Sequence, residues 1–230
     1  MVDTLGQDIR CWEPGDAISD IHAASTGVMI ITRLDPIDET KVTELDKDKN
    51  ARWLSCKIQR RNQADVYVLG TYFQSFHGMS RKATFQAIKQ FMKHPTGQDP
   101  YKPDDVRLVL GDFNANIIRP RNQQDKTTKQ QCHHLNLKPL NSDLQQPTFY
   151  RDKLLENGQK LFNHHYSLID YICTTANQAA KVNLVETLRV PIVSPDHSMV
   201  RVEFLDAGYE KRSKWKQTKN KIREIGRAHV

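Results

Sequence analysis

The most informative residues of this chain are acidic, amide and imidazole side chains that stand next to apolar runs. The first group follows the run Leu108–Leu110 and consists of Asp112 and Asn114. Two residues apart in an extended backbone, these two side chains point to the same face. A carboxylate beside a carboxamide at the end of a buried strand can orient a water molecule and contact a divalent metal ion or a phosphate.

Two later stretches repeat this arrangement of an acid beside an apolar run. Asp170 stands within residues 167–172, and Asp196 and His197 follow a Ser-Pro dipeptide. Each group has a simpler explanation when it is considered alone. An acid–amide pair forms turns, Asp170 could be a buried acid with satisfied hydrogen bonds, and Ser-Pro-Asp forms a bend. The three groups together, in this order, favour a site.

Short apolar and alternating runs predict mostly strands, with few helices. A helix is predicted over 80–93, with Ser80 as its N-cap and with Phe85, Ile88 and Phe91 at helical spacing. This aromatic stripe is more typical of a core face than of a cofactor site. The predicted strands are residues 27–32, 52–59, 66–72, 107–110, 147–150, 167–174, 182–188 and 199–205.

The remaining segments are predicted to be connections. Residues 35–50 are highly charged and indicate an exposed connection or a twisted hairpin, and residues 117–129 indicate a mobile surface loop. A loop containing Gly158 would join the strands 147–150 and 167–174. The fold class that follows is α+β, an α/β sandwich of two packed, mainly antiparallel sheets with helices on the outside.

The cysteines and histidines permit a zinc hypothesis. Cys132, His133 and His134 are followed about thirty residues later by His164 and His165. Adjacent histidines point apart, so we favour the alternative that these are exposed loop residues. The cysteines are widely scattered, which indicates reduced thiols in a cytosolic or nuclear protein; they are Cys11, Cys56, Cys132 and Cys173.

The composition is that of a globular protein of 230 residues, with 38% hydrophobic residues and a mean hydropathy of −0.67. The net charge is +7, but residues 209–230 contain eight Lys or Arg and two Glu, so residues 1–208 carry only about +1. Basicity therefore indicates nucleic acid only through the tail. No apolar run is long enough for a membrane span and no signal peptide is recognisable, which predicts an intracellular location, nuclear or cytoplasmic.

The three motifs together resemble the endonuclease/exonuclease/phosphatase superfamily of metal-dependent phosphodiesterases. They are Gly-Asp-Phe-Asn at 111–114, Ile-Asp-Tyr-Ile at 169–172 and Ser-Pro-Asp-His at 194–197. The resemblance covers roughly residues 1–206, and the sequence looks most like the endonuclease domain of a non-long-terminal-repeat retrotransposon. It implies hydrolysis of a phosphodiester by a water that a metal ion activates.

The resemblance also implies a role for each side chain. His197 would hydrogen-bond the scissile phosphate, with Asp170 holding the imidazole in the useful tautomer. Asp112, supported by Asn114, would orient and deprotonate the attacking water. Asp196 would join the oxygen ligands of Mg²⁺ or Mn²⁺.

The amino-terminal half departs from the family pattern. Tyr72 matches a tyrosine that contacts phosphate, but Ser75 follows where the nucleases often have a Pro-Asn pair, and a hydroxyl donates only one hydrogen bond. Asp8 stands where the family has a metal-binding Glu. It could still ligate a cation, although its side chain is one methylene shorter than that of Glu. The alternative is that Asp8 is only a charged residue near a frayed terminus. The family's first strand, with its Asn, has no counterpart, so we predict that the first strand is missing.

The predicted organisation has three parts. Residues 1–208 would be the domain, incomplete at its amino terminus, and residues 209–223 a basic segment or linker. Residues 224–230 look like the translation of a sequencing-library adapter and would be a processing scar.

The function that these features predict is Mg²⁺-dependent nicking of DNA, with RNA as another possible substrate. A retroelement would supply a reverse transcriptase domain in the same polyprotein. Two alternatives stay open. One is a phosphatase or lipid phosphodiesterase on the same scaffold. The other is a catalytically inactive remnant that binds nucleic acid weakly.

Overall fold

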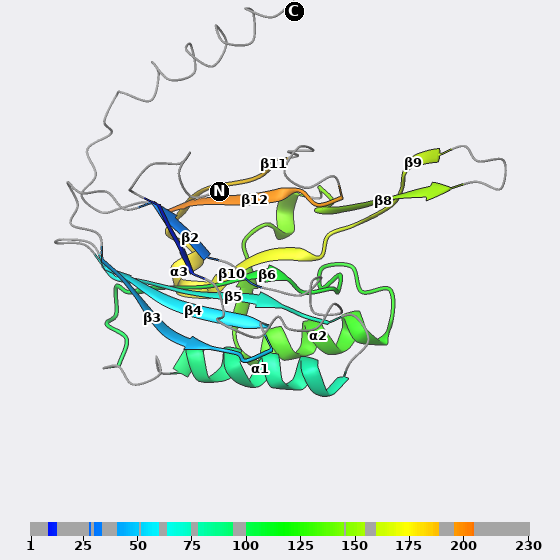
Figure 1. Cartoon of the computed structure of the whole chain (residues 1–230). Helices are drawn as coiled ribbons and strands as arrows, with labels where there is room; N and C mark the ends of the chain where they lie inside the picture. The colour runs from blue at the N-terminus through cyan, green and yellow to red at the C-terminus, as the bar shows by residue number, and fades with distance from the viewer. Residues whose placement is uncertain are drawn as a thin grey trace, which may run out of the picture.

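The computed structural model contains a six-stranded mixed sheet, three two-stranded sheets and two long helices (Figure 1). It describes residues 9–12, 28, 30–33, 41–50, 52–59, 64–74, 78–93, 100–144, 146–154, 160–188 and 196–204. The strands are β1 (Ile9–Trp12), β2 (Ile30–Arg33), β3 (Lys41–Lys47), β4 (Trp53–Gln59), β5 (Val66–Tyr72), β6 (Val106–Asp112), β7 (Leu137–Pro139), β8 (Phe149–Leu154), β9 (Lys160–Ser167), β10 (Asp170–Thr175), β11 (Val182–Leu188) and β12 (Met199–Phe204). The helices are α1 (Gly78–Lys93), α2 (Gln123–His134), the short α3 (Ala176–Ala179) and a 3₁₀ turn, η2 (Ser142–Leu144).

The large sheet has the strand order β3-β4-β5-β6-β10-β7 and is antiparallel except at its centre. There β5 and β6 are parallel, in a register that ends at the pair Tyr72 and Asp112. Parallel neighbours need a crossover connection, and α1 lies within it. The carboxyl ends of β5 and β6 therefore meet at one edge of the sheet.

Both faces of this sheet are covered, which explains why its central strands are continuous apolar runs. Successive side chains of a strand point to opposite faces. Val109 and Tyr171 point to one face, where they share a core with Ile88 of α1. Val68 and Leu54 point to the other face and belong to a second core.

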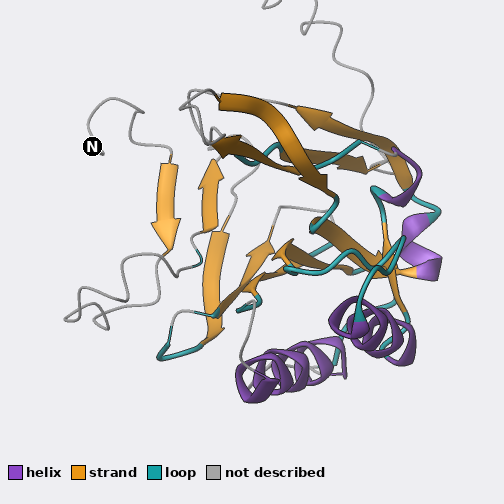
Figure 2. Cartoon of the chain, turned by 90° about the vertical axis from the view of Figure 1, so that its right-hand side faces the viewer, coloured by secondary structure: helices purple, strands orange, loops and turns teal. Residues whose placement is uncertain are grey.

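The layers of the molecule follow from this division. The helices α1 and α2 lie against one face of the six-stranded sheet, and the pairs β8–β9 and β11–β12 lie on its other side (Figures 1 and 2). The predicted α+β sandwich of mainly antiparallel sheets is confirmed. Among the described residues, the second layer consists of separate two-stranded pairs instead of one continuous sheet.

The mobile loop predicted over 117–129 is wrong, because α2 begins at Gln123. The Asn122 side chain caps this helix by accepting a hydrogen bond from the Asp125 N–H at 2.9 Å. The Asp125 carboxylate in turn accepts from the N–H groups of Asn116 and Arg121. The helix is held largely by polar contacts, so the apolar periodicity that sequence analysis needs is missing.

Two further elements, β9 and β7, differ from the sequence prediction, and one alternative is decided. The segment that was predicted as a Gly158-containing loop includes β9, which forms an antiparallel hairpin with β8 before β10 begins. The twisted-hairpin alternative for residues 35–50 is correct for β3, which pairs with β4 and shifts register between Glu44 and Asp46. The three-residue strand β7 was not predicted, since so short a strand has no recognisable period. No described helix has the length and apolarity that crossing a bilayer requires.

Candidate functional site at the sheet edge

Three of the predicted site residues occupy matching positions on three adjacent strands. Asp112, at the end of β6, is the register partner of Tyr72 on β5. It is also the partner of Asp170, the first residue of β10. Partners on neighbouring strands point to the same face of a sheet. Tyr72, Asp112 and Asp170 therefore form one row, on the face opposite the helices.

The backbone around Asp112 explains why a glycine precedes it and an asparagine follows two residues later. Gly111 has φ +139°, and a Cβ atom there would lie 1.8 Å from the Thr71 carbonyl oxygen. Only glycine fits so close to β5. Asn114 has φ 45°, a left-handed conformation that asparagine tolerates better than most residues. The Gly-Asp-Phe-Asn motif is thus a requirement of the backbone at the strand end.

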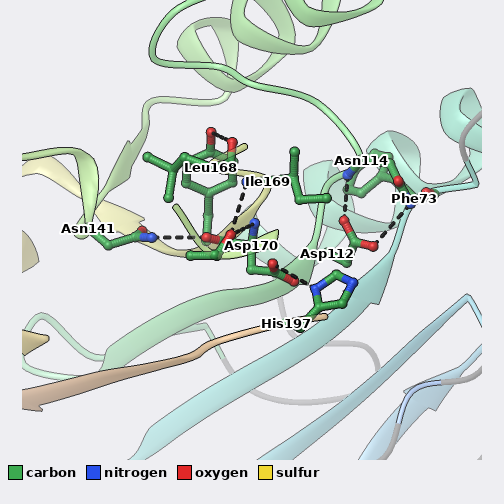
Figure 3. Close-up of polar contacts among 10 residues, drawn as sticks. Phe73, Asp112, Asn114, Asn141, Leu168, Ile169, Asp170 and His197 are labelled. Carbon is green, nitrogen blue, oxygen red and sulfur yellow. Dashed lines mark hydrogen bonds and ion pairs between the residues drawn. The ribbon is translucent and has the colours of Figure 1, made fainter. Parts of the chain in front are cut away.

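The Asp112 carboxylate is held by Asn114 (Figure 3). The Asn114 N–H donates to Oδ1 at 2.7 Å, and the Asn114 Nδ2 donates to Oδ2 at 3.1 Å. The same Nδ2 donates to the Phe73 carbonyl oxygen at 2.7 Å, which ties this turn to the end of β5. Asn114 also opposes the rise in the pKa of the Tyr72 hydroxyl. One amide therefore fixes the Asp112 carboxylate and joins its turn to the end of β5.

His197 lies against Asp170 in the same pocket. The distance from His197 Nδ1 to Asp170 Oδ2 is 3.0 Å, and both side chains are only partly exposed (Figure 3). His197 pairs with Phe149 through an isolated antiparallel bridge, and the two rings are 5.0 Å apart. The structure thus brings together five predicted residues: Tyr72, Asp112, Asn114, Asp170 and His197.

Sequence reasoning missed Thr148, whose hydrogen bonds connect the backbone at Asp170 with the backbone next to His197. Its hydroxyl oxygen accepts hydrogen bonds from the N–H groups of Ile169 at 3.1 Å and Asp170 at 2.9 Å. Its carbonyl oxygen accepts from the Ser198 N–H at 2.7 Å. Thr148 is fully buried. A Pro-Thr dipeptide at the start of a predicted strand gives no signal of this role.

Asn141 was also missed. It is fully buried, and its Nδ2 donates to the Asp170 carbonyl oxygen at 2.9 Å (Figure 3). Thr148 and Asn141 therefore bind the backbone of Asp170 on both its N–H and its carbonyl side. Their contacts are with main-chain groups more than twenty residues away, so sequence spacing does not reveal them.

Burial and a neighbouring acid raise the pKa of Asp112 above its ordinary value. Burial raises the pKa of Asp112 to about 6, and the charge of Asp170 adds to the increase. The Asn114 N–H, His197 and Arg81 oppose the shift in its pKa. A carboxyl group with a pKa this close to neutrality is typical of functional sites, because ordinary surface acids do not have it.

The pKa values of His197 and Tyr72 are shifted in the same direction. The hydrogen bond to Asp170 raises the pKa of His197, although burial opposes it. Burial raises the pKa of the Tyr72 hydroxyl, and the charge of Asp112 adds to this effect. The pocket therefore favours protonated His197 and a neutral tyrosine.

Arg81 of α1 lies behind the turn that carries Asp112. It is almost fully buried, and its Nη2 donates to the Phe113 carbonyl oxygen and, at 2.6 Å, to Thr128 Oγ1. Its guanidinium stands over the Phe73 ring at 4.9 Å. Burial lowers the pKa of Arg81, and Asp112 and Asp125 oppose that shift.

Of the two predicted metal ligands, only Asp196 lies among the described residues. Asp196 is exposed, its carbonyl oxygen accepts from the Tyr150 N–H, and its charge contributes to the raised pKa of His197. Asp8 and Ser75 lie outside the described residues. Within the described residues, no three His, Cys, Asp or Glu side chains are grouped closely enough to hold a metal ion.

The position of Cys132 does not support the zinc hypothesis. Cys132 is buried in the core beneath α2, where burial raises the pKa of its thiol to about 12. His133 and His134 are exposed at the end of α2, with ring centroids 6.4 Å apart. These two histidines are exposed as expected, but they belong to a helix and not to a loop. The side chains of His164 and His165 lie outside the described residues.

Comparison with solved structures assigns the fold. The endonuclease domain of TRAS1, a telomere-specific non-LTR retrotransposon, superposes with a TM-score of 0.61 at 16% identity, over 86% of this chain and 81% of that one. The 3′ phosphatase NExo from Neisseria, bound to a product DNA hairpin, gives 0.54 at 14% identity, over 86% and 79%. The AP endonuclease LMAP from Leishmania major gives 0.53 at 13% identity, over 85% and 70%.

These likenesses establish the endonuclease/exonuclease/phosphatase fold for this chain. The resemblance read from the three motifs is confirmed at the level of fold. No protein-family model and no curated protein sequence matches the chain.

Proposed function

We propose that this chain hydrolyses phosphodiester bonds in DNA and is the endonuclease domain of a retroelement. The observation that carries the proposal is a cluster of side chains: the pairs Asp112–Asn114 and Asp170–His197 lie together at one edge of the sheet (Figure 3). The fold shared with endonucleases supports the same reaction class. Fold alone does not specify chemistry, so the argument rests on the site.

Asp112 is the proposed general base. A pKa of about 6 leaves its carboxylate mostly ionised at neutral pH, yet basic enough to take a proton from an attacking water. The two hydrogen bonds from Asn114 fix the direction of the carboxylate before substrate arrives. This preorganisation avoids the cost of ordering the base during the reaction.

His197 and Tyr72 are the proposed phosphate-binding groups. Asp170 accepts a hydrogen bond from His197 Nδ1, and we assign Nε2, on the opposite side of the ring, to the phosphate. The raised pKa of His197 increases the fraction of imidazolium near neutrality, and a cation stabilises the charge that develops on phosphate. Tyr72 retains its proton and would donate to a phosphate oxygen.

A divalent cation, Mg²⁺ or Mn²⁺, fits the charge of this pocket. Two carboxylates, Asp112 and Asp170, are register partners, and their proximity contributes to the raised pKa of Asp112. Bound there, a cation would stabilise charge on the phosphate and acidify the attacking water. We propose Asp196 and Asp8 as its oxygen ligands, in keeping with the preference of Mg²⁺ for carboxylates.

The finer parts of the proposal rest on the similar structures. One of them is a retrotransposon endonuclease domain and another is bound to a DNA hairpin. We therefore propose DNA as the substrate and a reverse transcriptase domain as the partner in the full polyprotein.

A plasmid-nicking assay tests the function. Supercoiled plasmid is incubated with the wild-type chain in Mg²⁺ or EDTA, beside Asp112→Asn and His197→Ala. The matched control is Asp104→Asn, an acid-to-amide change at a highly exposed side chain outside the pocket. We expect nicking only with Mg²⁺, unchanged in the control, and at least about 100-fold slower in each pocket variant, the usual contribution of a general acid or base.

Three results would overturn this function. Nicking at equal rates by all four proteins would indicate a contaminating nuclease. No nicking by the wild type at micromolar concentration would indicate the non-catalytic alternative. Release of phosphate from a 3′-phosphorylated hairpin, with no nicking, would assign the phosphatase alternative, for which the Neisseria structure is the precedent.

A further inference from the structure

A groove with a volume of about 590 Å³ lies between α1 and α2, on the side of the sheet opposite the Asp112 pocket. The two helices run beside each other beneath the sheet in both views (Figures 1 and 2). Lys82, Gln86 and Lys89 of α1 form one wall, and Gln123 and Gln131 of α2 stand on the other. None of the residues lining the groove in the described part of the chain is Asp or Glu.

The charge of these helices is unlike that of the rest of the domain. Together α1 and α2 contain six Lys or Arg and one Asp, a formal charge of +5, whereas residues 1–208 as a whole carry about +1. The single acid, Asp125, is buried and accepts hydrogen bonds from backbone N–H groups. Positive charge is therefore concentrated on this one face, which attracts polyanions.

The floor of the groove is apolar. Phe85 and Leu135 line it and are partly exposed. Phe85 packs at 4.8 Å against Phe73 of the core, which holds its ring in place. Proteins commonly bind single-stranded nucleic acid in a basic groove that contains an aromatic side chain. Lysines bind the phosphates, and the bases stack on the aromatic ring.

The walls of the groove are rigidly connected to each other and to the site. Arg81 of α1 donates to Thr128 Oγ1 of α2 at 2.6 Å. Gln124, at the start of α2, donates to the Asn114 carbonyl oxygen at 2.7 Å. A preformed groove loses less entropy when a ligand binds. Its Gln124 end adjoins the turn that carries Asp112.

We propose that this groove binds a single-stranded segment of nucleic acid, with phosphates against Lys82 and Lys89 and a base against Phe85. A base can stack on the Phe85 ring only when it is unpaired and exposes its face, as in a single strand. The site is separate from the Asp112 pocket and does not depend on hydrolysis. It would retain one strand of an opened or overhanging DNA while the pocket acts elsewhere on the molecule.

Binding in EDTA tests this proposal apart from the proposed function. Fluorescence anisotropy measures the affinity of the full chain for a fluorescein-labelled oligo(dT) of about twelve nucleotides. The groove variant is Lys82→Glu with Lys89→Glu, and the charge-matched control is Lys41→Glu with Lys181→Glu, two lysines outside the groove. Circular dichroism confirms that each variant is folded.

We expect the groove variant to bind at least about tenfold more weakly and the control to change by less than about twofold. The slope of log affinity against log salt should fall by about 1.4 in the groove variant, since each phosphate contact contributes about 0.7. Equal losses in groove variant and control would overturn the proposal, because they indicate nonspecific attraction. So would equal affinity for a blunt duplex of the same length.

Photocrosslinking locates the strand directly. An oligonucleotide that carries 5-iodouracil is irradiated with the wild-type chain, and the crosslinked peptides are identified by mass spectrometry. We expect crosslinks within residues 78–93, at or next to Phe85. Crosslinks confined to the basic residues 209–223 or to the Asp112 pocket would overturn the assignment. Loss of nicking with retained binding would reject the proposed function while leaving the groove intact.

Discussion

The two faces of the central sheet differ although the same strands form both. Tyr171 and Phe113 point towards the helices and are almost fully buried in an aromatic core. Asp170 and Asp112, each one residue earlier in the chain, belong to the opposite face and form the pocket. A shift of one residue therefore separates the part of the sheet that stabilises the fold from the part that carries the charges.

The two faces also treat polar groups differently. On the helix face, the Tyr171 hydroxyl accepts from the Ile117 N–H at 3.1 Å and donates to the Leu168 carbonyl oxygen at 2.6 Å, so its burial costs little. On the pocket face, Asp112 has hydrogen bonds and yet keeps a raised pKa. The Tyr171 hydroxyl on the helix face is thus paired as both donor and acceptor, whereas on the other face two carboxylates, Asp112 and Asp170, lie close enough to raise the pKa of Asp112.

The largest effect on stability is expected at Gly111, which lies between the core residues of β6 and Asp112. Gly111→Ala would place a Cβ atom 1.8 Å from the Thr71 carbonyl oxygen at φ +139°, so β5 and β6 would have to separate. We expect a loss of more than about 4 kcal/mol in the free energy of unfolding, measured by urea denaturation, or failure to fold.

Gly78→Ala is the matched control, because an added Cβ there meets no atom within 4 Å. We expect a change of less than about 1 kcal/mol. Similar losses in both variants would mean that Gly111 is not uniquely constrained, and the contrast between the two faces would lose its structural basis.

The sequence contains enough information for the row of site residues and for the central strands. Asp112 and Asn114 were predicted to lie together, and they are hydrogen-bonded to each other. The predicted reason was wrong, because Asn114 lies beyond the end of β6 with φ 45°, so that a turn and not the period of a strand brings the two side chains together. Asp170 and His197 were predicted as a pair, and the structure sets them 3.0 Å apart. The site residues were predictable because their three motifs, in this order, resemble those of a known family, and the central strands were predictable from their apolar runs.

The remaining features depend on contacts that no local pattern encodes. The helix α2 lacks an apolar stripe because its anchors are polar, among them Asp125 and Thr128. Thr148 and Asn141 act on the backbone of Asp170. Their direction depends on tertiary packing, which overrides local propensity. The side chain of Asp196 is exposed, which its place in the motif did not predict.

The second prediction compares a buried hydroxyl on each face. Thr148→Val removes the acceptor for two buried N–H groups, and Tyr171→Phe removes the partners of one N–H and one carbonyl. Each variant should lose about 2–3 kcal/mol in the free energy of unfolding, since unpaired buried polar groups are costly. Only Thr148→Val should also lower nicking, because only Thr148 positions Asp170. A larger loss of nicking in Tyr171→Phe, measured at equal folded fraction, would contradict the division between the faces.

The third prediction concerns the charge of Asp112. Its pKa is raised from 3.8 to about 6 in the folded state, so folding disfavours the ionised form. The free energy of unfolding should fall as pH rises from about 4, and the full penalty should be present above about pH 6. Asp112→Asn lacks this ionisation. Relative to wild type, the variant should gain about 2 kcal/mol between about pH 4.5 and pH 7.5.

Urea denaturation of both proteins at several pH values measures this gain. The control is Asp104→Asn, at a highly exposed side chain, whose stability should follow wild type at every pH. If Asp112→Asn follows wild type as well, then Asp112 is not a buried, uncompensated acid, and the two faces do not differ in charge.

The smallest effect is expected at the His197–Asp170 pair. Asp170 is the largest cause of the raised pKa of His197, and Asp196 is the smallest of its named causes. Asp170→Asn should therefore lower the pKa of His197, and Asp196→Asn should lower it less. NMR titration of the imidazole Hε1 resonance, in EDTA, measures both shifts.

The stability of the same variant follows from the sign of this shift. A raised pKa stabilises the folded state below the unfolded value of 6.5, and the stabilisation disappears as pH rises through the folded pKa. Asp170→Asn should therefore be more destabilised, relative to wild type, at about pH 5.5 than at about pH 8.5. If Asp196→Asn shifts the pKa of His197 as much as Asp170→Asn does, then the imidazole is oriented by the exposed acid. In that case the raised pKa of His197 would depend on Asp196, before β12, and not on Asp170, which the register of β6 and β10 places beside Asp112.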